Sequence, residues 1–174
     1  AGYYKDLCGL PDARAVALRS PFDPANMGLW CARQVSTRYK DRADSIAKVS
    51  DLLAVMAAAQ PGHYLAFFPS YSYLQQVCED FTARYPDQPT LCQESAMDEG
   101  QRTEFLAQFL ARDGKPLLGF AVLGGVFGEG VDLTGESLIG VAVVSPGLPQ
   151  IGPRQEQLRD YFEETRGAGF DYAY

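Results

Sequence analysis

Histidine is almost absent from this sequence, and its cysteines lack the spacing of a metal site. His63 is the single histidine of the 174-residue chain, so a histidine-based triad or metal cluster would depend on one residue. The cysteines stand at positions 8, 31, 78 and 92, without a CxxC pair, whereas zinc and iron–sulfur sites usually take ligands from close pairs. Each cysteine lies in or beside an apolar run, which predicts four buried free thiols and no metal site in this chain.

Long hydrophobic runs are also missing. No apolar run approaches the roughly 20 residues of a membrane-spanning helix, and the opening residues do not resemble a signal peptide. We therefore expect a cytoplasmic protein with no membrane partner.

Basic residues are fewer than acidic ones, 15 against 22, which gives a formal net charge of −7. This balance argues against a protein that binds nucleic acid through bulk charge, so any nucleic-acid surface has to be local. Hydrophobic residues make up 47% of the chain and charged residues 21%, which is typical of a globular domain.

The common phosphate-binding loops are absent as well. The sequence contains neither G-x-x-x-x-G-K-[ST] nor G-x-G-x-x-G, and Gly125, Gly128 and Gly130 show the reverse spacing of the second motif. The chain thus has no phosphate-cradling lysine of its own. No nucleophile with a nearby base can be identified either, so the residues alone describe half of a site.

What the sequence does contain is an alternation of apolar strands and amphipathic helices. The patterns predict strands over 14–18, 29–35, 63–68, 90–94, 116–123 and 137–144, and helices over 41–59, 71–85, 98–113 and 153–164. Continuously apolar strands between helices indicate an α/β domain with a mostly parallel sheet and helices on both faces. In such a sheet, function lies in the loops at the carboxyl ends of the strands.

Two stretches near expected strand ends carry candidate ligand contacts. In "FFPSYSY", Tyr71 can stack on a base and Ser70 can donate to a phosphate, or the serine caps a helix whose tyrosines lie in the core. In "STRYKDR", Arg38 and Arg42 either contact phosphate or belong to a solvated turn.

The stretch "GGVFGEGVDLTGESLIGVAVV", residues 124–144, is unusually rich in glycine and carries two acids, Glu129 and Asp132. Bare backbone lets main-chain N–H groups approach a phosphate or sugar closely. The alternative is a tight connection between strands in which glycine supplies unusual backbone angles. The spacing of the glycines does not separate these two interpretations.

Taken together, these loops resemble a known family. "YLAFFPSYSYLQQVCEDF" resembles motif IV, and "LGGVFGEGVDLTGESLIGVAVVSPGLPQ" resembles the motif V region, of the DinG and xeroderma pigmentosum group D family of superfamily-two DNA helicases. The opening "YYKDLCGLP…LRSPFDPANM" and the closing "GFDYAY" also resemble stretches of this family. The resemblance implies that residues 1–174 form the second RecA-like domain, a three-layer α/β domain.

The implied activity is ATP-driven, 5′-to-3′ unwinding of DNA, as in DNA repair. The partners would be single-stranded DNA and the first RecA-like domain of the same polypeptide. That first domain would make most of the contacts to ATP and Mg²⁺. By the same resemblance, Glu129, Gly130 and Asp132 form the ATP side of motif V. The residues expected to face DNA are Ser70, Tyr71, Gly125 and Gly128, with Arg38 and Arg42 on the same face.

The sequence also departs from the family. Gly128 stands where the family often has serine, and the chain contains no motif VI pattern, Q-x-x-G-R-x-x-R. Walker A, Walker B and any iron–sulfur cysteines belong to the first domain in such enzymes, so we expect a fragment that is inactive alone. A non-enzymatic nucleotide- or protein-binding α/β domain is the alternative.

Overall fold

The computed structural model describes residues 2–111, 115–128, 131–148 and 151–174. It forms two compact units: one contains residues 33–147, and the other contains residues 1–32 and 148–174. The two units are considered separately below.

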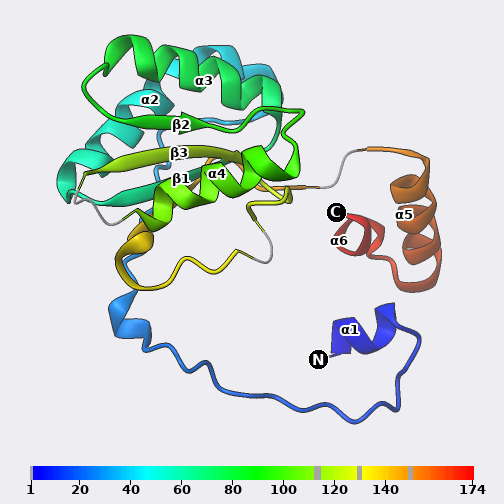
Figure 1. The fold of residues 1–174 in the computed structure, drawn as a ribbon. Coiled ribbons are helices and arrows are strands. Elements are labelled where there is room, and N and C mark those ends of the chain that lie inside the picture. The colour runs from blue at the N-terminus through cyan, green and yellow to red at the C-terminus, as the bar shows by residue number, and fades with distance from the viewer. Residues whose placement is uncertain (1, 112–114, 129–130, 149–150) are drawn as a thin grey trace. The chain divides into compact units, whose positions relative to one another are not determined.

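The larger unit is built on a four-stranded sheet in which all strands run parallel (Figure 1). The strands are β1 (His63–Phe68), β2 (Thr90–Cys92), β3 (Leu117–Val122) and β4 (Gly140–Val143), in the order β2-β3-β1-β4. Phe68 pairs with Val122 in the β1–β3 register, so β1 and β3 end level with each other. All six residues of β1 are buried, which explains why this central strand is continuously apolar.

Helices cover both faces of the sheet (Figure 1). Helices α2 (Arg42–Ala59) and α3 (Tyr71–Arg84) share a core with one face of β1 and β3 that includes Phe68, Phe81 and Phe120. On the other face, α4 (Glu99–Leu110) places Phe105 and Phe109 against Leu65 and Phe67. Two 3-10 turns, η2 (Tyr39–Asp41) and η3 (Gly135–Ser137), complete this unit.

The helix boundaries follow from local capping chemistry. The Asp98 side chain accepts from the Gln101 N–H at 2.8 Å while the Gln101 side chain accepts from the Asp98 N–H at 2.8 Å, which is a capping box at the start of α4. The sequence "QPG" follows α2, and β1 begins at His63, as expected.

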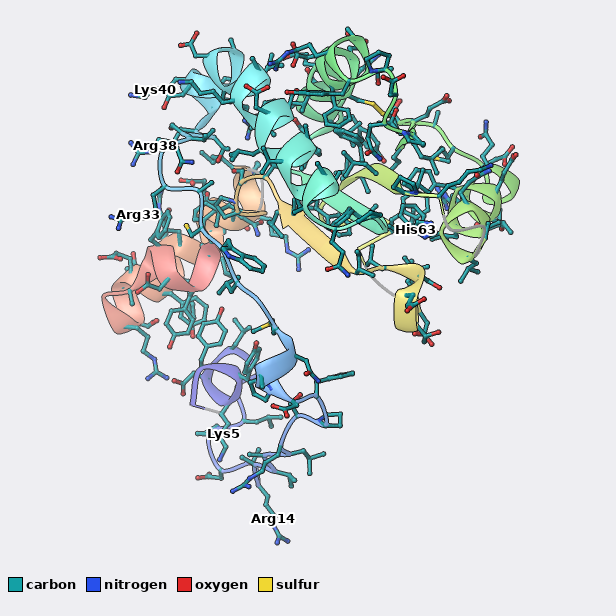
Figure 2. The ribbon with its side chains drawn as sticks, turned by 90° about the vertical axis from the view of Figure 1, so that its left-hand side faces the viewer. Lys5, Arg14, Arg33, Arg38, Lys40 and His63 are labelled. Carbon is teal, nitrogen blue, oxygen red and sulfur yellow. A yellow bond between two sulfur atoms is a disulfide. The ribbon has the colours of Figure 1, made fainter. Side chains whose placement is uncertain are left out.

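The His63 side chain contacts three separate segments around the amino end of β1. The Nδ1 atom lies 3.0 Å from the Phe109 carbonyl oxygen and 3.3 Å from that of Ser137, while Nε2 lies 3.1 Å from the Lys115 carbonyl oxygen. The side chain is buried and points into the fold in Figure 2. It therefore lies where the end of α4, the residues before β3 and the η3 turn meet the sheet.

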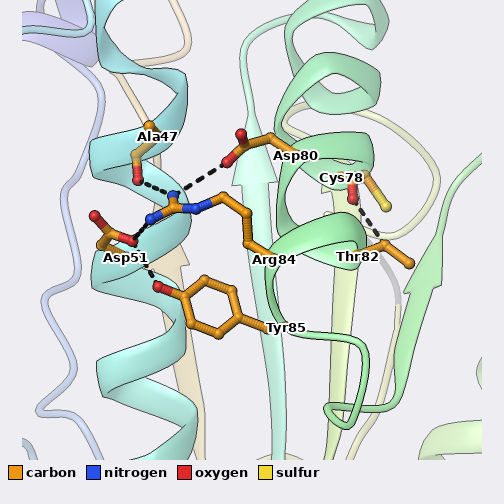
Figure 3. Close-up of polar contacts among 7 residues, drawn as sticks. All are labelled: Ala47, Asp51, Cys78, Asp80, Thr82, Arg84 and Tyr85. Atoms are coloured by element: carbon orange, nitrogen blue, oxygen red, sulfur yellow. Dashed lines mark hydrogen bonds and ion pairs between the residues drawn. The ribbon is translucent and has the colours of Figure 1, made fainter.

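Polar contacts join α2 to the end of α3 (Figure 3). The Arg84 guanidinium donates to the Ala47 carbonyl oxygen at 2.9 Å and pairs with both Asp51 and Asp80. The Tyr85 hydroxyl donates to Asp51 at 2.5 Å, and this bond, with Arg84, holds the pKa of the Asp51 carboxyl below its ordinary value. A carboxyl whose pKa is lowered in the folded state stabilises that state at pH values above its ordinary pKa. This stabilisation is lost as the pH falls through the folded-state pKa.

Close packing between the sheet and α4 leaves no room for a side chain at Gly119. A Cβ built there would lie 2.4 Å from Phe109 Cζ and 2.8 Å from Leu65 Cδ1, and both of these side chains are buried. We expect Gly119→Ala to destabilise the fold by about 1–3 kcal/mol, because an overfilled core has to shift its neighbours.

The measurement for Gly119→Ala is the midpoint of urea unfolding. Gly128→Ala is the matched control, because its Cβ would meet backbone atoms at no less than 3.4 Å, an ordinary contact. Equal midpoints for the two variants would contradict the packing described here.

The smaller unit contains three helices, α1 (Gly2–Leu7), α5 (Pro153–Arg166) and α6 (Gly169–Ala173), and the 3-10 turn η1 (Pro24–Asn26). Aromatic stacking holds the helices together: the Tyr172 ring lies 4.2 Å from that of Phe162 and 5.0 Å from that of Tyr3, centroid to centroid. Gly167 ends α5 with a φ of 64°, a left-handed conformation that glycine adopts readily.

Two of the expected strands are wrong. Residues 14–18 and 29–35 form no strand, and Val16, Leu18 and Trp30 are 78%, 89% and 88% exposed. Their apolar character favours a strand only where a neighbouring strand offers hydrogen bonds and a surface to pack against. The expected strands at 63–68, 90–94, 116–123 and 137–144 are confirmed, with shorter limits for the last three.

The expectation of four buried free thiols is also wrong. Cys8 and Cys31 are free but exposed, and Cys78 of α3 forms a disulfide with Cys92 of β2. The packing of α3 on the sheet brings these two cysteines together across 14 residues of sequence. Among the described residues, no helix is long and apolar enough to cross a membrane.

Candidate functional site at the carboxyl edge of the sheet

Three loops leave the sheet at its carboxyl edge, and direct contacts join them. The Leu123 N–H donates to the Phe68 carbonyl oxygen at 2.8 Å, so the start of the glycine-rich loop lies against the end of β1. From the end of β2, Gln93 contacts both other loops: its Nε2 lies 3.0 Å from the Tyr71 hydroxyl, and its Oε1 lies 2.8 Å from the Val122 nitrogen.

The segment after β1 contains both a structural serine and an accessible tyrosine. Ser70 caps α3, since its hydroxyl accepts from the Tyr73 N–H at 3.4 Å. Tyr73 lies in the core, and its hydroxyl is 2.6 Å from that of Ser45 in α2. Tyr71 is 37% exposed at the start of α3. The capping interpretation is therefore confirmed for Ser70, and Tyr71 is the side chain available to a ligand.

Glycine in the next loop serves local geometry at some positions and leaves the surface bare at others. Gly124 and Gly135 have φ values of 71° and 63°, where other residues are disfavoured. A Cβ at Gly125 would lie 3.1 Å from the Val122 carbonyl oxygen. Gly128 has space for a side chain and is exposed. Both interpretations of the glycines thus find support, the tight connection at 124, 125 and 135 and the bare surface at 128.

Of the three residues expected on the ATP side, only Asp132 lies within the described residues, since Glu129 and Gly130 lie outside them. Asp132 is exposed in the segment between β3 and η3. Among the described residues, its carboxylate has no hydrogen-bond or ion-pair partner. Nothing in the described fold uses this charge, so the carboxylate is available to a ligand.

The two candidate arginines differ in their surroundings. The Arg42 guanidinium lies 5.3 Å from the ring centroids of both Tyr39 and Tyr73, which places it beside the start of α3. Arg38 precedes the η2 turn and projects outward with Lys40 (Figure 2), and its side chain forms no ion pair among the described residues. The structure therefore connects Arg42 to the Tyr71 segment and provides no such link for Arg38.

Sequence reasoning missed two features of this edge. The sequence pattern predicts Gln93 only as the end of a short strand, although a polar amide directly after an apolar strand is a recognisable signal. Ser145, just past β4, has a φ of 87° and is the sole non-glycine residue with positive φ in the described part of the chain. Unusual backbone of this kind is concentrated near functional sites.

No group of three or more His, Cys, Asp or Glu side chains that could hold a metal ion is found within residues 2–111, 115–128, 131–148 and 151–174. The chemistry available at the carboxyl edge is instead hydrogen bonding and stacking, and the segment between β3 and η3 adds the exposed carboxylate of Asp132. These features define an α/β domain with a parallel sheet, the class in which ligands bind in the loops after the strands.

Comparison with known families identifies the kind of domain. A family model described as a helicase C-terminal domain matches residues 53–174, which is more than half of the chain and includes all four strands. The chain therefore belongs to the helicase C-terminal domain family. Its parallel sheet, covered by helices, is consistent with the RecA-like fold expected from the sequence. Comparison with curated proteins gave no match.

Proposed function

We propose that this chain is the second RecA-like domain of an ATP-dependent DNA helicase of the DinG and xeroderma pigmentosum group D type, which moves 5′ to 3′ along single-stranded DNA. Family membership supports nucleic-acid binding and a role as part of a helicase. The choice of DNA, the polarity and the roles of motifs IV and V are the parts that this proposal adds.

The observation that carries the proposal is the meeting of two loops at one edge. Tyr71, in the motif IV segment, and Val122, the last β3 residue before the motif V segment, are both hydrogen-bonded to Gln93. An exposed aromatic ring offers a stacking platform for a base, and an exposed loop rich in glycine lets a phosphate approach the main chain closely. Both contacts are independent of the base sequence of the DNA, as a motor that moves along a strand requires.

On the ATP side, the proposal assigns a contact to Asp132, with Glu129 and Gly130 shaping the same loop. The chemistry of the residue fits, because an exposed carboxylate with no partner in the described part of the chain can accept hydrogen bonds from ribose hydroxyls. When bound, ATP with Mg²⁺ supplies the phosphoryl transfer that drives translocation. This chain has no Walker lysine, so its own contribution is to bind the nucleotide from the second side.

Replacing Tyr71 with alanine tests the DNA side. We expect Tyr71→Ala to weaken the binding of single-stranded DNA by about 1–3 kcal/mol through lost stacking. The measurement is a fluorescence anisotropy titration of a labelled oligothymidylate at one fixed, low salt concentration, because phosphate contacts depend on salt.

The control for Tyr71→Ala is Tyr161→Ala, which removes another exposed tyrosine, from α5 of the smaller unit. Its affinity for the oligonucleotide should stay within twofold of the wild-type value. If both variants bind as tightly as the wild type, Tyr71 is not part of a DNA-binding surface.

A further inference from the structure

Gln93 is a buried polar side chain located where the three loops of the carboxyl edge meet. It follows β2 directly, and its main-chain N–H donates to the Phe120 carbonyl oxygen at 2.9 Å, which extends the β2–β3 ladder by one bond. Only 5% of the residue is exposed. A buried amide needs partners for its own polar groups, and Gln93 finds them in the two neighbouring loops.

The hydrogen bonds of the Gln93 side chain have a defined direction. The Val122 N–H can only donate, so the atom that faces it at 2.8 Å is the amide oxygen, Oε1. The Nε2 amino group consequently faces the Tyr71 hydroxyl at 3.0 Å and donates to it. One amide thus joins the last residue of β3, just before the glycine loop, to the aromatic residue that begins α3.

This direction has a consequence for Tyr71. Since its phenolic oxygen accepts a hydrogen bond from Gln93, its own proton is free to donate to another group. Tyr71 is 37% exposed, and a Cβ at Gly125 would lie 3.9 Å from Gln93 Nε2. The tyrosine hydroxyl and the first turn of the glycine loop are therefore neighbours of the same amide.

We propose that Gln93 is a positioning residue: it orients the Tyr71 hydroxyl as a donor and fixes it relative to the glycine loop, so that both contact the same nucleic-acid strand. The ligand group that suits a tyrosine O–H free to donate, beside an exposed glycine-rich loop, is a phosphate oxygen of the strand backbone. This inference rests on the proposed function, and it adds a residue that touches neither DNA nor nucleotide.

A mutant cycle with Tyr71→Phe tests the positioning role. Gln93→Glu keeps the bond from Val122 but replaces the donor to Tyr71 with an acceptor, so the tyrosine proton turns inward. Gln93→Met removes both bonds without adding charge. We expect Tyr71→Phe and each Gln93 variant to weaken oligothymidylate binding about three- to tenfold, the effect of one hydrogen bond. Combining Gln93→Met with Tyr71→Phe should add less than a further twofold loss.

Gln108→Glu, on the exposed face of α4, is the control for the added negative charge, and its affinity should match that of the wild type. Far-ultraviolet circular dichroism and the urea midpoint of each variant report folding, and Gln93→Met replaces Gln93→Glu in the comparison if the buried carboxylate prevents folding. Tyr71 is partly exposed, so Tyr71→Phe folds in any case.

Three results would overturn the positioning role. These are wild-type affinity in the Gln93 variants, wild-type affinity in Tyr71→Phe, or losses that multiply in the double variant. If the wild-type chain itself fails to bind the oligonucleotide, the proposed function is refuted and the positioning role with it. Normal binding by the Gln93 variants beside weakened binding by Tyr71→Phe refutes the positioning role alone.

Discussion

The purified 174-residue chain is expected to hydrolyse ATP no faster than a protein-free control, with or without single-stranded DNA. The sequence contains no G-x-x-x-x-G-K-[ST] loop and no Q-x-x-G-R-x-x-R motif. It therefore lacks the lysine that holds the phosphates and the arginine that stabilises charge on the transferring phosphoryl group. An arginine of this kind contributes roughly 10³- to 10⁵-fold to the rate of comparable enzymes.

Release of phosphate from ATP, followed over hours, measures this activity. Fractions across a gel-filtration peak separate turnover by the chain from turnover by a contaminant. Turnover that follows the protein concentration across the peak, at a rate typical of helicases, would show that the chain contains a complete catalytic site. The assignment of ATP binding to two domains would then be wrong.

In the full-length helicase, Asp132→Asn is expected to decrease DNA-stimulated ATP turnover, and this is the second largest effect that we expect. The substitution keeps the shape of the side chain and removes its charge. If Asp132 accepts charge-assisted hydrogen bonds on the nucleotide side, the loss is about 1.5–3 kcal/mol, or roughly a ten- to a hundredfold decrease in DNA-stimulated ATP turnover. Because the carboxylate is exposed and has no partner among the described residues, the free energy of unfolding should change by less than about 0.5 kcal/mol.

Asp87→Asn removes the same charge from an exposed turn after α3 and is the matched control, with turnover expected within twofold of the wild type. Steady-state ATP hydrolysis across a range of DNA concentrations separates a nucleotide defect from a DNA-binding defect. An unchanged DNA-stimulated turnover in Asp132→Asn would remove Asp132 from the ATP side.

The elements that were predictable from the sequence are those with a strong local signal. The apolar run at 63–68 predicted β1, and the amphipathic pattern at 98–113 predicted α4. The segment at residues 29–35 carried a similar apolar signal but forms no strand. A strand depends on a partner elsewhere in the chain, and local composition does not report whether that partner is present.

For the candidate site, the residues within recognisable motifs were predictable, and the contacts between distant segments were not. Motif IV and motif V pointed to Tyr71 and Asp132, both of which the structure leaves exposed. The bond from Gln93 to Tyr71 spans 22 residues and depends on how α3 packs beside β2. The disulfide between Cys78 and Cys92 depends on the same packing. Such pairings follow from the tertiary fold and have no signature in the spacing of the residues.

The anchoring of the glycine loop has a consequence for the entropy of ligand binding. Before the loop, the Val122 N–H is bonded to Gln93, and after it the Ser137 carbonyl oxygen lies 3.3 Å from His63. Contacts at both ends of a loop restrict the conformations open to it before any ligand arrives. A strand or nucleotide that binds there has less freedom to remove, and more of the interaction energy is retained as affinity. If a strand or nucleotide binds this loop as proposed, the buried residues Gln93 and His63 lower the entropic cost of binding at a surface that neither of them touches.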